Sequence, residues 1–205
     1  LKALRYTCEN GTDLLLELPE GHIWLGGEES SKDGTIFNAN IPTEEVFSAP
    51  QYNGVNGIVY STKPLIYHGN TISDFSLTFK EGKIVDYTAK EGYEVLKELI
   101  ETDEGSHYLG EVALVDHFSP ISQSNQIFFE TLFDENASCH LAIGASYPTC
   151  LKDSDGLSEE ELKERGLNYS LTHVDFMIGD EHMNIKGYTR DGQEVDIMID
   201  GRLQV

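Results

Sequence analysis

The sequence predicts an α+β fold made mainly of antiparallel sheet with a few helices, in a single domain over residues 1–205. Three observations support this prediction. Short β-rich runs separated by turn residues fill the first 88 residues, helical periodicity is confined to a few segments in the middle, and strand-like runs return over the last 35 residues. The sequence contains no internal repeat, low-complexity tract or linker that would divide it.

Apolar and β-branched residues in short runs predict the strands of the first part. Asn10-Gly11 forms one of the turns between them. Phe75, Leu77 and Phe79 alternate with polar residues, as they do in a strand with one buried face, and the turn at 80–83 leads into a short strand at 84–85. The other expected strands of this part are 6–8, 14–18, 23–25, 57–60, 65–67 and 72–79.

Three segments carry helical patterns. Apolar side chains at positions 95, 96, 99 and 100 share one face of a helix over 93–100. A second helix is expected at about 136–146, after a buried strand at 128–133. A third begins at Ser158, whose spacing to Glu161 forms a capping box, and ends at Gly166. The chain then returns to strands at 172–178, 184–189 and 195–199, the last two joined by a turn at 190–192.

Composition excludes several classes of function. Lys and Arg total 14 against 36 Asp and Glu, so the formal net charge is −22. A field of that sign repels phosphate backbones and anionic lipid, so we expect neither a nucleic-acid nor a membrane-surface partner. Cys8, Cys139 and Cys150 are an odd set without a C-x-x-C pair, which argues against a disulfide framework and for a reducing cytoplasm. We find no signal peptide and no apolar run of membrane length.

His173 and Asp175 form the sharpest local pattern that suggests a site. A spacing of two on a strand puts both side chains on one face, where they can approach one cation, while Val174 and Phe176 face the core. The alternative is a surface histidine beside a solvated aspartate, because an H-x-D pattern is common by chance.

Glu135 and His140 lie across the start of the expected second helix, where a strand ends and polar groups often gather in sites. If the helix persists, His140, Gly144 and Tyr147 share one of its faces. The alternative makes the residues at 134 and 136 simple helix caps and His140 a satisfied core histidine.

Glu111 and Glu45 are further candidate ligands. Glu111 interrupts an apolar run, and a buried carboxylate needs a partner such as a cation, although a strand-end glutamate that reaches solvent is an equal alternative. Glu44 and Glu45 point to opposite sides of an extended chain, so one would bind a metal while the other serves as an outer partner or general base. A solvated acidic loop is the competing interpretation. Mixed carboxylates and imidazoles, with one carboxylate able to bridge, are the ligands that a pair of hydrolytic metals needs.

Four separated segments, IPTEEVF, LGEVALV, LFDENASCHLAIG and HVDFMIG, together resemble the thermophilic metalloaminopeptidase family, and the resemblance extends over the whole chain. It implies a metal-dependent aminopeptidase that removes N-terminal residues from peptides with two divalent ions (Zn, Co, Mn or Mg). The ligands that it implies are Glu45, Glu111, His140, His173 and Asp175, with Glu111 as the bridging carboxylate and Glu135 as either a further ligand or the general base.

The resemblance also implies further catalytic residues and a larger assembly. Tyr147 matches a catalytic-site tyrosine. As a mechanistic hypothesis, Tyr147 would donate a hydrogen bond to the developing oxyanion, and Glu44 or Glu135 would relay a proton to the leaving amine. We expect residues 1–205 to be the C-terminal metal-binding half of a longer aminopeptidase, with the N-terminal domain absent, and the longer protein to be a homodimer. Two rivals remain: a non-catalytic metal-binding or assembly domain, and a metal-dependent amidohydrolase acting on non-peptide amides.

Overall fold

Two packed antiparallel sheets form the core of the protein in a computed structural model that describes residues 1–38 and 44–204. The larger sheet has the strand order β10-β9-β7-β2-β1-β14-β15-β16, and β8 pairs with β9 at its side. Its strands are β1 (Ala3–Thr7), β2 (Asp13–Glu17), β7 (Val55–Tyr60), β8 (Leu65–Tyr67), β9 (Asn70–Lys80), β10 (Lys83–Glu91), β14 (Asn184–Tyr188), β15 (Glu194–Ile199) and β16 (Arg202–Leu203).

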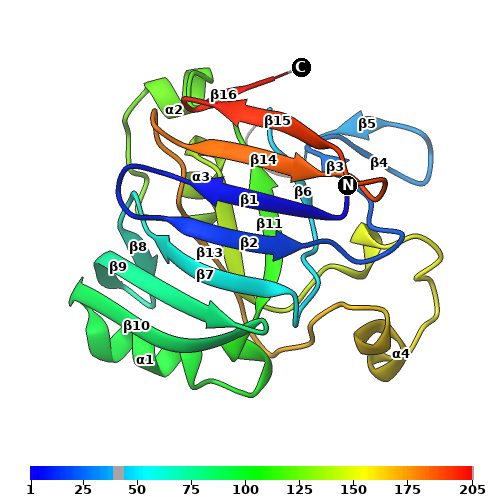
Figure 1. Ribbon diagram of the computed structural model, residues 1–205, viewed down its shortest axis with the longest axis horizontal. Coiled ribbons are helices and arrows are strands. Elements are labelled where there is room, and N and C mark those ends of the chain that lie inside the picture. Colours follow the sequence, from blue (N-terminus) through cyan, green and yellow to red (C-terminus); the bar gives the residue numbers. More distant parts are fainter. Residues whose placement is uncertain (39–43, 205) are drawn as a thin grey trace.

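The smaller sheet contains most of the candidate metal ligands. Its strand order is β13-β12-β11-β6-β3, and every pairing in it is antiparallel. Figure 1 shows β11 behind the larger sheet, crossing the direction of β1 and β2. The five strands are β3 (Leu25–Gly26), β6 (Val46–Ser48), β11 (Leu109–Leu114), β12 (His140–Gly144) and β13 (His173–Met177).

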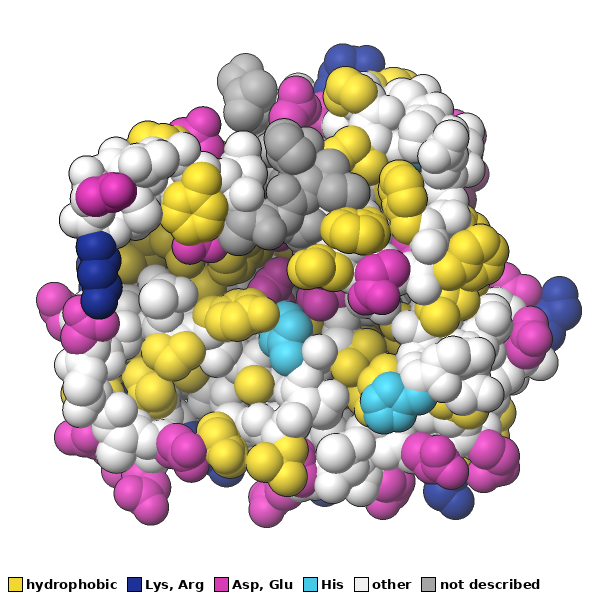
Figure 2. Space-filling view, turned by 180° about the vertical axis from the view of Figure 1, so that it is seen from behind, with side chains coloured by type: hydrophobic (Ala, Val, Ile, Leu, Met, Phe, Trp, Pro, Cys, Tyr) yellow, Lys and Arg dark blue, Asp and Glu magenta, His cyan; other side chains and the backbone are white. Residues whose placement is uncertain are grey.

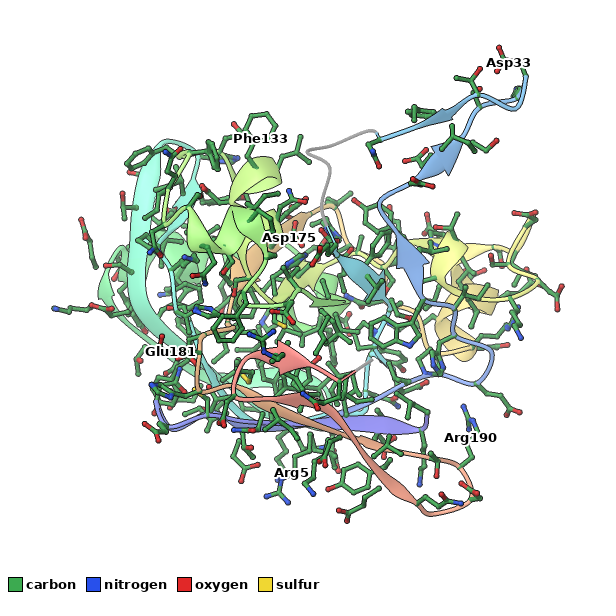
Figure 3. The ribbon with its side chains drawn as sticks, turned by 90° about the horizontal axis from the view of Figure 1, so that it is seen from above. Arg5, Asp33, Phe133, Asp175, Glu181 and Arg190 are labelled. Carbon is green, nitrogen blue, oxygen red and sulfur yellow. The ribbon has the colours of Figure 1, made fainter. Side chains whose placement is uncertain are left out.

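Helices and a separate hairpin complete the fold. The hairpin of β4 (Glu29–Ser30) and β5 (Ile36–Phe37) extends away from the two sheets, with Asp33 at its tip (Figure 3). The α-helices of the described residues are α1 (Tyr93–Ile100), α2 (Pro120–Gln123), α3 (Thr131–Asp134) and α4 (Glu159–Glu164), and 3-10 turns occupy Gly105–His107, Glu135–Ala137 and Pro148–Cys150.

Alternation of side chains explains why the two sheets pack face to face. Leu141 and Ile143 of β12, and Val174 and Phe176 of β13, turn toward the larger sheet and join its buried leucines in one core cluster. Phe176 meets Phe75 of β9 with their ring centroids 5.5 Å apart. The side chains that alternate with these residues therefore point to the opposite face of the smaller sheet.

The predicted α+β fold of mainly antiparallel sheet is confirmed, as are the elements with the clearest local patterns. α1 covers 93–100 and buries Leu96, Leu99 and Ile100. α4 begins at a capping box, in which the Ser158 hydroxyl accepts from the Glu161 N–H and the Glu161 carboxylate accepts from the Ser158 N–H. In both cases residues close in sequence supply the whole pattern.

The helix predicted at about 136–146 is wrong, because His140–Gly144 is strand β12. This strand lies between β11 and β13 and is buried on both faces, so its apolar run has no period that separates strand from helix. His140, Gly144 and Tyr147 consequently share no helical face. The interpretation of residues 134 and 136 as caps of that helix also fails.

The buried strand predicted at 128–133 is wrong as well. Phe128 and Phe129 are exposed, and Phe129 has a φ of +60°, which interrupts an extended chain. The N–H groups of Phe128 and Glu130 donate to the buried Asp134 carboxylate, at 2.7 and 3.2 Å, instead of to a neighbouring strand. That side chain therefore folds the segment into a turn before α3.

Across residues 1–38 and 44–204, no helix combines the length and apolar character that crossing a membrane requires.

Gly144 offers a test of the β12 geometry. Its φ is +108°, and a Cβ there would lie 2.1 Å from the Thr172 carbonyl oxygen. Gly144→Ala should therefore lower the free energy of unfolding of the metal-free chain by about 3 kcal/mol, measured by urea denaturation. Gly156→Ala is the matched control, because Gly156 also has a positive φ, +78°, but has no atom within 4 Å of the new methyl group. We expect it to cost about 1 kcal/mol, and equal losses would contradict the close contact.

Candidate metal centre

The register of three neighbouring strands brings the candidate ligands to one face of the smaller sheet. Ala142 of β12 pairs with Glu111 of β11 on one side and with Asp175 of β13 on the other, so these three residues stand in one row. His140 and His173 each lie two residues from a member of this row and therefore point to the same side. The small side chain of Ala142 leaves the space between the two carboxylates open.

Glu111 lies between the two histidines. Its Oε1 is 3.5 Å from His140 Nε2, and its Oε2 is 3.6 Å from His173 Nε2. Each oxygen of a single carboxylate thus faces a different imidazole, as a carboxylate that bridges two cations does.

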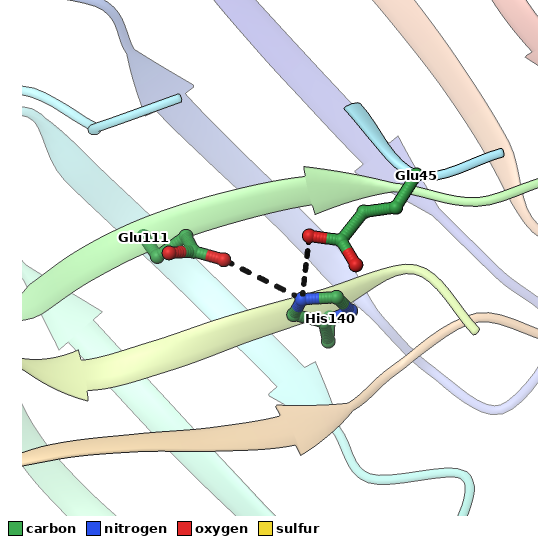
Figure 4. A group of neighbouring side chains, drawn as sticks. All are labelled: Glu45, Glu111 and His140. Atoms are coloured by element: carbon green, nitrogen blue, oxygen red, sulfur yellow. Dashed lines mark ion pairs between the residues drawn. The ribbon is translucent and has the colours of Figure 1, made fainter. Parts of the chain in front are cut away.

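Two groups of three potential ligands follow from this arrangement, and Glu111 belongs to both. In the first, shown in Figure 4, Glu45 Oε1 is 3.8 Å from His140 Nε2. In the second, Asp175 Oδ1 is 3.5 Å from His173 Nε2. The potential ligand atoms of each group lie within 4.8 Å of one another, close enough to surround an ion.

Both histidines are held with Nε2 toward the carboxylates. His140 Nδ1 is 2.9 Å from the Ser138 carbonyl oxygen, and His173 Nδ1 is 2.7 Å from that of Ala145. Because a carbonyl can only accept, each Nδ1 carries the proton and donates it, which leaves Nε2 of the neutral ring with a lone pair for a metal.

Two buried polar atoms that make no hydrogen bond within the described residues lie at the same place. His140 Nε2 and Asp175 Oδ1 are both buried and accept or donate no hydrogen bond in the described part of the chain. Burying such atoms costs free energy unless a further group satisfies them, and a cation bound between them would satisfy both. The donor set of three carboxylates and two imidazoles fits divalent cations.

The pKa values of the metal-free protein show how strongly these charges interact. Burial lowers the pKa of His140, but its interaction with Glu111 and the charges of Asp175 and Glu45 outweigh burial and raise that pKa to about 10. Burial likewise opposes protonation of His173, and Asp175 and Glu111 raise its pKa to about 9. Protons therefore occupy both rings at neutral pH when no metal is bound.

Glu135 and Tyr147 lie beside the two groups. Burial, followed by the charge of Asp175, raises the pKa of Glu135 to about 9. Burial and the nearby carboxylates raise the pKa of Tyr147 to about 12, so its hydroxyl keeps its proton at neutral pH. The Tyr147 ring lies 4.7 Å from the His173 ring, centroid to centroid, while the residue remains half exposed.

Glu44 is the predicted site residue that the structure does not bring into the cluster. It is exposed and lines a separate hollow next to α2, whereas its neighbour Glu45 turns toward His140. The two side chains thus diverge as an extended chain requires. The first three residues of the IPTEEVF motif, 41–43, lie outside the described residues.

A pocket of about 890 Å³ opens over the ligands. Figure 2 shows the hollowed face, where hydrophobic side chains surround acidic groups and a histidine. Sequence reasoning missed much of its wall, because those residues come from separate segments without a shared pattern. The apolar and hydroxyl wall residues that it missed are Leu25, Phe47, Tyr67, Thr131, Leu132 and Thr149.

Comparison with known proteins gives consistent results. Residues 1–203 match the family described as thermophilic metalloprotease (M29). Aminopeptidase AmpS of Bacillus subtilis (strain 168) is 57% identical over 199 residues, which are 97% of this chain and 48% of that protein. Aminopeptidase 2 of Geobacillus stearothermophilus is 56% identical over 191 residues, covering 93% of this chain and 46% of that protein. Aminopeptidase T of Thermus aquaticus is 45% identical over 192 residues, covering 94% and 47%.

Solved structures share the fold. Wild-type AmpT from Thermus thermophilus superposes with a TM-score of 0.93 at 43% identity, over 100% of this chain and 50% of that one. A 2,5-dihydroxypyridine dioxygenase from Pseudomonas putida KT2440 has a TM-score of 0.62 at 13% identity, over 99% of this chain and 55% of that one, a likeness of fold alone.

The chain spans about half the length of the curated relatives that it matches. Within that half, the family match runs from residue 1 to residue 203 and includes all four motifs that carried the resemblance. This chain belongs to the thermophilic metalloprotease family M29.

Proposed function

We propose that this chain is the catalytic part of a metal-dependent aminopeptidase that hydrolyses N-terminal residues from peptides with two divalent cations. The position of Glu111 carries the proposal, because its two oxygens face different histidines and it belongs to both ligand groups. The relatives are named aminopeptidases, which supports peptides as substrates.

Two sets of residues would hold the cations. His140, Glu45 and one Glu111 oxygen form the first, and His173, Asp175 and the other Glu111 oxygen form the second. His140 Nε2 and Asp175 Oδ1, which are buried and make no hydrogen bond among the described residues, fit this assignment, because a cation would satisfy both atoms. The chemistry that two such cations supply is a water of lowered pKa and a polarised substrate carbonyl.

Glu135 is our candidate for moving the proton from the attacking water to the leaving amine. Its pKa of about 9 is high for a carboxyl because of burial, so the group can hold a proton near neutral pH. It lines the pocket beside His173 and Asp175, whereas Glu44 lines a different hollow, so we favour Glu135 over Glu44 for this step. A role for Glu135 as a sixth ligand is the alternative.

Tyr147 would stabilise the negative charge that develops on the substrate carbonyl oxygen. Its hydroxyl keeps its proton because its pKa is raised to about 12, so it can donate a hydrogen bond throughout the reaction. Its ring packs against His173 and Phe47, which limits the positions that the hydroxyl can take.

The identity of the metal, the length of the full protein, its compartment and its oligomeric state are also proposals. Carboxylate-rich ligation suits Zn, Co, Mn or Mg, so availability would select the metal. We propose that the chain is the C-terminal, metal-binding half of a longer cytoplasmic enzyme that forms a homodimer. The cysteines, all of them free, fit a reducing compartment, and the relatives are about twice as long.

Two rivals are separable by experiment. A non-catalytic metal-binding or assembly domain would hold one structural cation in a closed site, whereas the pocket of about 890 Å³ leaves the ligands next to open space. An amidohydrolase acting on non-peptide amides would share the metals but would resist competition by bestatin-like peptides and free amino acids.

Replacing the shared carboxylate tests the centre directly. Glu111→Gln should abolish binding of two metal ions, measured by elemental analysis, and lower hydrolysis of leucine p-nitroanilide by more than about 100-fold, because both ligand groups lose a charged member. Glu160→Gln on exposed α4 is the charge-matched control. Full metal content and activity in Glu111→Gln would refute the assignment.

Metal affinity should rise with pH. His140 and His173 have raised pKa values of about 10 and 9, so below these values a cation must displace their protons. Affinity should therefore increase up to about tenfold per pH unit for each displaced proton between pH 6 and 9. Competition with a chelator gives the affinity, and calorimetry in buffers of different protonation enthalpy counts the released protons. An affinity independent of pH would contradict the ligand set.

Removing one hydroxyl tests the oxyanion role. Tyr147→Phe should lower kcat on leucine p-nitroanilide by about 100-fold, while KM and metal content change little, because the lost hydrogen bond acts mainly in the transition state. Tyr169→Phe is the matched control, since Tyr169 is about equally exposed, 50% against 48% for Tyr147. An unchanged kcat in Tyr147→Phe would exclude this role.

A further inference from the structure

The outer edge of β13 borders the candidate metal centre. β13 is the outermost strand of the smaller sheet, with β12 on its inner side. The Ala145 N–H donates to the Thr172 carbonyl and the Ile178 N–H donates to the Cys139 carbonyl, both at 2.8 Å. Main-chain groups alternate in direction along an antiparallel strand. Even-numbered residues of β13 therefore bond to β12, and odd-numbered residues turn their N–H and C=O groups outward.

One end of this outer edge is hydrogen-bonded to another segment of the chain, and among the described residues the rest of it is not. The Met177 carbonyl accepts from the Thr62 N–H at 2.9 Å, which closes one end. In the described part of the chain, the outward N–H and C=O groups of His173 and Asp175 have no hydrogen bond to another residue. The open stretch is thus formed by the two residues whose side chains belong to the second ligand group.

These main-chain groups lie beside the pocket, which both residues line. Asp175 is only 7% exposed, and buried main-chain N–H and C=O groups almost always find a partner. Val174 lines the pocket although its side chain packs in the core between the sheets, so the backbone of β13 forms that part of the wall. Figure 3 shows Asp175 between α3 and the base of the β4–β5 hairpin, whose residues line the other sides.

The charge of the pocket indicates what kind of group enters it. No lysine or arginine occurs among the described residues that line it, whereas its acidic lining residues are Glu28, Glu29, Glu45, Glu111, Glu135 and Asp175. Even with two divalent cations bound, these acidic lining residues favour the binding of a cationic group in the pocket over an anionic one. The amino terminus of a peptide is such a group.

We propose that the main chain of an extended peptide substrate pairs with the outer edge of β13 at His173 and Asp175, as an added strand with its amino terminus among the acidic residues. The inference rests on the proposed peptidase function and deepens it by assigning the binding of the substrate backbone. Such pairing uses no substrate side chain, so it tolerates many sequences while holding the peptide beside the metal ligands.

The test uses the two-residue period of a strand, in which alternate amides face the neighbouring strand. The probe is an alanine-rich pentapeptide whose first peptide bond is replaced by a non-hydrolysable CH2–NH linkage, bound to the metal-loaded chain and followed by calorimetry. Two analogues carry a single N-methyl group on the amide nitrogen of residue 3 or residue 4. Only alternate amides of an added strand face β13, so one analogue should bind about tenfold more weakly and the other within about twofold of the parent.

The outcome separates this inference from the proposed function. Equal effects of the two methyl groups, or none, would overturn strand addition even if the chain hydrolyses leucine p-nitroanilide. Conversely, alternation in binding without any hydrolysis would support the edge and count against the peptidase. Acetylating the amino terminus of the parent probe should weaken binding at least fivefold if the acidic wall receives the amine, and unchanged binding would overturn that part.

Discussion

The register of β11, β12 and β13 is the constraint on which the rest of this structure depends. It aligns Glu111, Ala142 and Asp175 in one row, and the period of two then adds His140 and His173 to the same face. The opposite face of these strands supplies Leu141, Ile143 and Phe176 to the core between the sheets. A slip of one residue in β12 would exchange the two faces, exposing apolar groups and burying the histidines among leucines, so packing of the core fixes the ligands in place.

The same arrangement carries an electrostatic cost that a cation relieves. Three carboxylates and two imidazoles share a buried region, and burial alone would disfavour every charge there. Without metal, protons on the histidines compensate for the carboxylates, which raises both histidine pKa values. Binding of a cation would therefore be linked to proton release from the histidines, and the hydrogen bonds of both Nδ1 atoms to carbonyl groups hold the rings with Nε2 toward the carboxylates.

A shared fold does not by itself indicate a shared function. The dioxygenase from Pseudomonas putida shares the two-sheet arrangement at 13% identity, so the architecture by itself does not specify peptide hydrolysis. In this chain the candidate ligands lie on one face of the smaller sheet, next to the outer edge of β13. The strand that carries the candidate ligands His173 and Asp175 also presents their main-chain groups, so one element would hold both the proposed cation and the proposed peptide.

The elements with the clearest local patterns, and the list of candidate ligands, followed from the sequence alone. The apolar face of α1 and the capping box of α4 each depend on residues within a few positions of one another, and the H-x-D spacing in β13 needs only the period of a strand. That 140–144 is a strand depends on tertiary contacts, because burial on both faces removes the polar alternation that distinguishes a strand from a helix. Tertiary structure also separated Glu45 from Glu44 and set Glu111 between two histidines, since these relations join segments that are far apart along the chain.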